Sequence, residues 1–135
     1  QGDSIIYRRV CELAREAEDI LLVSQYCPTG KLGRILRSKS ARLYFNPPEL
    51  AGPLNKAVIS VGMMFSRHKT LYNRTRYLHA KFMIFTMPNG EKIAVTGSHN
   101  FVYGGVLLGT REIALETSDK KIIRQLEAFF REHVA

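Results

Sequence analysis

A histidine and a lysine stand two residues apart in the stretch "YLHAKFMIFT", residues 77–86, which is otherwise largely apolar. Neutral imidazole is a nucleophile toward phosphorus and an ammonium group neutralises phosphate oxygens, so His79 and Lys81 together suit phosphoryl transfer. In a strand, side chains alternate between two faces and advance about 3.3 Å per residue. His79 and Lys81 then share one face, about 7 Å apart. The residues expected on the opposite face are Ala80, Phe82, Ile84 and Thr86.

A second polar group follows in "TGSHN", residues 96–100, at the end of the next apolar run. Alternation places Ser98 and Asn100 on one face there. If the two runs are antiparallel neighbours, a hydroxyl, an amide, an ammonium and an imidazole come together. Each would cost about 1–3 kcal/mol if buried without a partner, and a bound phosphate would supply partners. The alternative is structural: His79 bonded to backbone, and Lys81 extending its charge to water at a sheet edge.

The motifs "HAK", "GSHN" and "REI", within residues 79–113, together resemble the signature of the phospholipase D superfamily. The element order of the chain is also similar to one half-unit of that family, most of all to the C-terminal half of bacterial cardiolipin-synthase-like proteins. The resemblance implies a covalent phosphohistidine, with His79 as the nucleophile or its acid partner. It further implies that Lys81 and Asn100 hold the nonbridging phosphate oxygens, that Ser98 supports this cradle, and that Glu112 orients His79.

One position departs from the family pattern. The family has an aspartate seven residues after the histidine, where this chain has Thr86. An odd offset along a strand turns that side chain away from the His79 face, so its loss removes no phosphate-binding group directly. The departure still favours one alternative function, a noncatalytic anion-binding or dimerisation module.

Positive charge is concentrated just before the His-x-Lys pair. Twenty Lys and Arg against twelve Asp and Glu give a formal charge of +8, and such a field attracts polyanions. In "RHKTLYNRTRY", residues 67–77, we expect Lys69, Arg74 and Arg76 to bind an anionic substrate, although basic runs are often only solvated loops. The two tyrosines favour a second alternative, a nuclease of the same superfamily, because a basic groove tracks a phosphate backbone and aromatic rings stack on bases.

Apolar periodicity and turn residues predict an α/β fold with a single mixed β-sheet and helices on both faces. Asn89-Gly90 predicts the turn of a hairpin, and Ser118 or Asp119 caps a closing helix. That helix has an expected buried stripe of Ile122, Ile123, Leu126, Phe129, Phe130 and Val134. The predicted helices cover 3–19, 31–39, 53–65 and 118–134, and the predicted strands cover 19–26, 41–46, 78–86, 92–98 and 111–117.

A length of 135 residues suits one domain, so residues 1–135 are expected to form a single phospholipase D-like domain that is half of a two-fold active site. The partner is a second half in the same gene product or another copy of the chain, because attack and leaving-group protonation need two histidines. Cys11 and Cys27 lack metal-ligand spacing, so no metal and no cofactor are expected. With no secretion signal and no membrane-spanning run, a cytoplasmic location or peripheral membrane contact is favoured.

The favoured function is therefore phosphodiester hydrolysis or phosphatidyl transfer on phospholipids, by a metal-independent phospholipase D-like phosphodiesterase.

Overall fold

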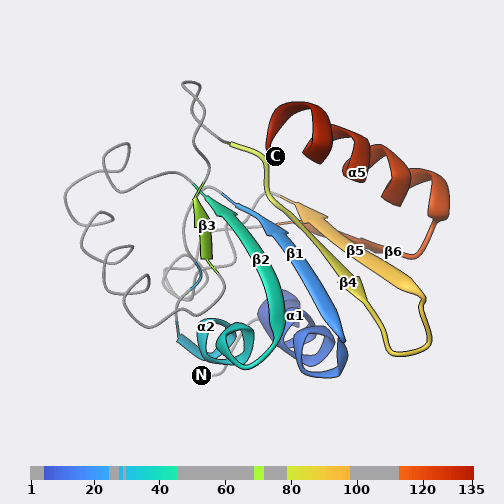
Figure 1. The fold of residues 1–135 in the computed structure, drawn as a ribbon. Helices are drawn as coiled ribbons and strands as arrows, with labels where there is room; N and C mark the ends of the chain where they lie inside the picture. Colours follow the sequence, from blue (N-terminus) through green and yellow to red (C-terminus); the bar gives the residue numbers. More distant parts are fainter. Residues whose placement is uncertain (1–4, 25–27, 29, 46–68, 72–78, 98–112) are drawn as a thin grey trace.

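The described part of the chain forms one mixed sheet flanked by helices (Figure 1). The computed structural model describes residues 5–24, 28, 30–45, 69–71, 79–97 and 113–135. Within these residues the six-stranded sheet has the order β3-β2-β1-β4-β5-β6. Its strands are β1 (Asp19–Val23), β2 (Ser40–Phe45), β3 (Lys69–Leu71), β4 (Phe82–Thr86), β5 (Lys92–Gly97) and β6 (Ala114–Thr117). Strands β1, β2 and β3 are parallel, and β4, β5 and β6 pair in antiparallel fashion, so the predicted mixed sheet is confirmed.

The described helices cover both faces of the sheet, as predicted. Helices α1 (Ile5–Glu16) and α2 (Gly30–Arg37) pack on one face, and α5 (Lys120–His133) packs on the other (Figure 1). On β4, Met83 and Phe85 belong to the α1/α2 core, whereas Phe82 and Ile84 belong to the α5 core. This two-sided burial explains why the central strands read as continuous apolar runs. None of the described helices has the length and apolar character needed to cross a membrane.

Two local features predicted from the sequence are present in the structure: the turn between β4 and β5, and the cap at the start of α5. In the hairpin turn, Gly90 has φ 89°, and the Asn89 side chain accepts from the Glu91 amide at 2.9 Å. At the other end, the Asp119 carboxylate accepts from the backbone amides of Lys121 and Ile122 at 2.8 and 3.3 Å. The predicted turn and the Asp119 cap are thus both confirmed.

Several helices and strands are shorter in the structure than predicted. Strand β4 begins at Phe82 rather than at residue 78, so His79 and Lys81 precede the strand. The helix predicted over 53–65 lies outside the described residues. The buried stripe of α5 is partly wrong: Ile123, Phe130 and Val134 are buried, but Phe129 is 38% exposed. Helical spacing gives the direction of Phe129 but not how far the sheet beneath it extends.

One edge of the sheet collects the candidate chemistry. The carboxyl ends of β1, β2, β3 and β5 meet there with the amino ends of β4 and β6. In open α/β sheets, ligands bind outside the carboxyl ends of parallel strands. His79 and Lys81 lie at this edge because they lead directly into β4.

Candidate functional site

The His-x-Lys segment is held against β5 by its backbone. The carbonyl oxygen of Lys81 accepts from the Thr96 hydroxyl at 3.1 Å and from the Gly97 amide at 3.4 Å. These bonds extend the hairpin ladder by one residue beyond β4. The Lys81 side chain is half-buried and the His79 side chain is exposed. The segment therefore has a fixed backbone and an imidazole that a ligand can reach.

The two side chains touch. The Nζ atom of Lys81 lies 3.3 Å from Nδ1 of His79 and donates to the His79 carbonyl oxygen at 3.1 Å. An ammonium group only donates, so Nδ1 accepts in this contact and the proton of the neutral ring sits on Nε2. The nucleophilic imidazole and the cationic ammonium group are thus within hydrogen-bonding distance of each other. A phosphate attacked by His79 would therefore lie close enough for Lys81 to neutralise its oxygens.

A cavity of about 530 Å³ opens beside this pair. His79 and Lys81 contribute polar groups to its lining, and Phe82 with Leu126 and Phe129 of α5 contribute apolar side chains. The rings of Phe82 and Phe129 meet edge to face, with centroids 6.3 Å apart. The remaining lining residues are Ala80, Thr96 and Gly97. The cavity therefore joins cationic and apolar walls at one edge of the sheet.

Gly97 controls how closely β6 approaches this edge. A Cβ atom at Gly97 would overlap the carbonyl oxygen of Ile113 and lie 2.8 Å from Cα of Ala114. Both obstacles are backbone atoms of the neighbouring chain segment, so neither can rotate away. The sequence interpretation used Gly97 only as part of the "GSHN" resemblance and missed this role. A glycine inside a strand pattern was the available signal, since it often marks a close backbone approach.

The other predicted site residues are placed only in part. Lys69 is the first residue of β3 and pairs with Leu43 of β2. Strand β3 lies three strand spacings, or about 14 Å, from β4, and the side chain of Lys69 is not described. The remaining ones, outside the described residues, are Arg74, Arg76, Ser98, Asn100 and Glu112. The chain next to two of them is described at the same edge of the sheet as His79: Gly97 precedes Ser98 and pairs with Ala114 of β6.

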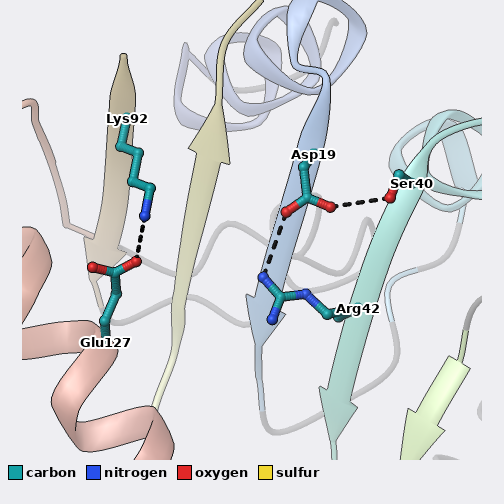
Figure 2. A network of polar contacts seen from close by, with 5 residues as sticks. All are labelled: Asp19, Ser40, Arg42, Lys92 and Glu127. Atoms are coloured by element: carbon teal, nitrogen blue, oxygen red, sulfur yellow. Dashed lines mark hydrogen bonds and ion pairs between the residues drawn. The ribbon is translucent and has the colours of Figure 1, made fainter. Parts of the chain in front are cut away.

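Thr86, which replaces the family aspartate, lies at the opposite end of β4. It lies five positions after Lys81, or about 17 Å along a strand. Its direct neighbours are Asp19 on β1 and Lys92 on β5. Figure 2 shows that Asp19 accepts from Ser40 at 3.0 Å and from Arg42 at 3.4 Å, while Lys92 meets Glu127 of α5 at 2.6 Å. A carboxylate and an ammonium already flank position 86, far from the His79 cavity.

A second cavity, of about 670 Å³, lies at this far end between the hairpin turn and the start of α5. It is larger than the His79 cavity, yet its lining includes Lys92 and Glu127, which neutralise each other in an ion pair. Its described lining residues include the Ser118 hydroxyl but no histidine. Across the described residues, no three His, Cys, Asp or Glu side chains gather as metal ligands.

Comparison with known proteins identifies the class. Residues 44–134 match the sequence profile of a family described as "Cardiolipin synthase, PLD-like domain", where PLD denotes phospholipase D. This match spans more than half of the chain. The chain therefore belongs to this family of the phospholipase D superfamily. A search of curated proteins finds no significant match.

Two solved structures share the fold. The chain is similar to polyphosphate kinase from Porphyromonas gingivalis, with a TM-score of 0.62 and 17% identity, over 94% of this chain and 23% of that one. It is also similar to Nuc, a phospholipase D family member from Salmonella typhimurium, with a TM-score of 0.65 and 12% identity, over 93% of this chain and 84% of Nuc. The chain thus spans less than a quarter of the kinase. Identities this low show a common fold alone.

Proposed function

We propose that this chain forms one half of an active site that catalyses phosphodiester hydrolysis or phosphatidyl transfer on phospholipids through a covalent bond between His79 and phosphorus. The observation that carries the proposal is the 3.3 Å contact between His79 Nδ1 and Lys81 Nζ, two residues that line the cavity. Family membership supports the reaction class. The apolar side chains in the cavity lining support a lipid diester.

The contact between the two side chains defines how the reaction starts. Attack through Nε2 needs the ring proton on Nδ1, which Lys81 occupies. A nonbridging phosphate oxygen draws the ammonium group away, and exchange with solvent then moves the ring proton from Nε2 to Nδ1. The family resemblance assigns Glu112 to accept a hydrogen bond from this Nδ1–H. Nε2 then bonds to phosphorus, and the bond from phosphorus to the leaving oxygen breaks. Lys81, with Asn100 and Ser98, balances the charge that builds on the phosphate oxygens.

Completion of the cycle requires a second acid. The leaving oxygen takes a proton from another histidine, after which water or an alcohol attacks phosphorus, breaks the bond to His79 and returns a proton to that histidine. Among the described residues that line the cavity, His79 is the sole imidazole. We infer that a second phospholipase D half, from the same gene product or from another copy of the chain, supplies the acid. Such a pair places the two halves of the active site across a two-fold axis.

The position of Thr86 weighs against the noncatalytic alternative. That alternative rested on the missing aspartate, but position 86 lies about 17 Å from Lys81 along β4. The substitution therefore removes no group from the cavity. The nuclease alternative rests on the basic residues within 67–77, of which only the backbone of 69–71 is described.

The proposal is tested by trapping the intermediate. The full-length protein is mixed with a phospholipid labelled at phosphorus, in excess chelator because no metal is expected to take part, and quenched during turnover. Mass spectrometry should locate an acid-labile label on His79. His79→Ala should abolish labelling and turnover, whereas the control Lys92→Ala, at the opposite end of β5 from the cavity, should retain both. An active His79→Ala variant, or a label on another residue, would contradict the proposal.

A further inference from the structure

Phe129 is exposed where its helix predicts burial. It belongs to the apolar stripe of α5, whose members Ile123 and Phe130 are buried, yet Phe129 remains 38% exposed. Its ring packs against Phe82 at 6.3 Å and against His133 at 5.1 Å, both measured between centroids. One side of the ring is thus anchored by protein contacts, and the ring also lines the cavity beside His79.

The apolar surface continues from this ring across the sheet. Strand register places Phe82 beside Thr96 and Thr96 beside Leu115, so these three residues share the face that α5 covers. Leu115 is 54% exposed. An apolar strip, defined as Phe129, Leu126, Phe82 and Leu115, therefore flanks the His79 end of the sheet. Phe82 is buried, and the exposed apolar area of the strip comes mainly from Phe129 and Leu115. Exposed apolar side chains grouped near a cationic group are typical of a site for an amphiphilic ligand.

We propose that this strip binds the acyl-glycerol portion of a phosphatidyl lipid and that Phe129 determines specificity for acylated diesters. The proposal rests on the proposed function, because His79 and Lys81 must hold the phosphate. The cavity lining suits a single phosphodiester with an apolar substituent, because the Lys81 ammonium group and the His79 imidazole line the same cavity as the apolar side chains of α5 and Phe82. Its volume of about 530 Å³ suits a glycerol ester with the first methylene groups of a chain.

A nucleic-acid strand fits this lining less well. Its phosphates repeat every nucleotide, so a bound strand must place another charge close to the first. Apart from His79, Lys81 and Thr96, the described lining residues of the cavity are apolar or glycine. A second phosphate buried against these apolar side chains would lose its hydration without gaining a hydrogen-bond partner. Stacking of a single base on Phe129 is the alternative role of this ring. The binding experiment below distinguishes base stacking from acyl binding.

The experiment measures equilibrium binding by calorimetry in a His79→Asn background, which blocks turnover in every sample of the full-length protein. The probes are dihexanoyl phosphatidylglycerol, its deacylated diester glycerophosphoglycerol, and a short oligothymidylate. Phe129→Ala should weaken the dihexanoyl lipid about tenfold, because most of the ring's apolar contact is lost, and should change the deacylated diester less than twofold. Phe129→Leu keeps an apolar side chain and should keep lipid binding within about threefold.

Two further variants control for folding and surface apolarity. Phe129→Gln retains side-chain length and helix propensity and should reproduce the selective loss if the alanine variant is unstable. Ile5→Ala removes an apolar residue that is 80% exposed on α1, across the sheet, and should leave all three affinities unchanged. Thermal unfolding of each variant shows whether a loss reflects the site or the fold.

Two outcomes would overturn the inference. The first is an equal loss of acylated and deacylated diester in Phe129→Ala. The second is oligothymidylate binding that Phe129→Leu abolishes, which would show base stacking, since leucine has no π face. The inference and the proposed function fail separately. Selective acyl binding without a label on His79 rejects only the chemistry, and a labelled His79 without acyl selectivity rejects only this use of Phe129.

Discussion

Replacing Gly97 with alanine should push β6 away from β5 at the candidate site. The added Cβ would collide with the carbonyl of Ile113 and approach Cα of Ala114 to 2.8 Å. Because the obstacles are backbone atoms, relief requires a shift of the chain segment itself. The Gly97 amide also bonds the Lys81 carbonyl, so the shift reaches the His79 segment.

The size of the effect follows from the kind of contact. Overpacking by one methyl group typically costs about 1–3 kcal/mol, so the melting temperature should fall by about 4–12 °C for a chain of this length. Catalysis should suffer more than stability. A misplacement of about 1 Å costs on the order of a hundredfold in rate, so phosphodiester turnover should drop by about that factor at a temperature where the variant is folded.

Gly90→Ala provides the matched control. Gly90 lies in the hairpin turn at the opposite end of β5, where φ is 89° and no atom would lie within 4 Å of an added Cβ. Its alanine variant should lose about 1–2 kcal/mol through backbone strain, a similar loss of stability, and should keep normal turnover. Denaturant titration and a turnover assay on both variants decide the matter. A Gly97→Ala protein as stable and active as the wild type would refute the close-approach argument, and equal losses of turnover in both variants would refute the link to the site.

The remaining predictions concern stability. Arg9 of α1 donates to both carboxylate oxygens of Glu116 on β6, at 2.8 and 2.9 Å, and this hydrogen bonding lowers the pKa of Glu116. A lowered carboxyl pKa stabilises the fold above the ordinary carboxyl range, and the contribution is lost as pH falls through the lowered pKa. Both side chains are more than one-third exposed, so a double-mutant cycle with Arg9→Ala and Glu116→Ala should give only about 0.5–1 kcal/mol at pH 7, and less at pH 3. A coupling energy independent of pH would contradict this sign. Asp119→Ala should destabilise the protein by about 1 kcal/mol in denaturant titration through loss of the α5 cap, whereas Ser118→Ala should have little effect; equal losses would remove the cap from the explanation.

Local patterns determined much of this protein. Alternation along β4 correctly separated the faces of Phe82 and Met83. It was wrong for His79 and Lys81, which precede the strand and line one cavity together with Phe82 rather than facing away from it. The Asn-Gly turn and the Asp119 cap depend on neighbouring residues only, and both were predictable for that reason. The prediction of a mixed sheet covered on both faces followed from apolar runs too continuous for a sheet with one wet face.

Tertiary structure decided which surfaces meet. Periodicity assigned Phe129 to the core, but the position of α5 over the sheet edge leaves its ring partly exposed beside His79. The role of Gly97 depends on Ile113, sixteen residues later in the chain, whose carbonyl comes close only because β5 and β6 pair in one register. The Lys81–His79 contact likewise depends on a backbone held by β5. Spacing along a chain fixes the direction of each side chain, whereas the partner that it contacts is set by packing between segments distant in sequence.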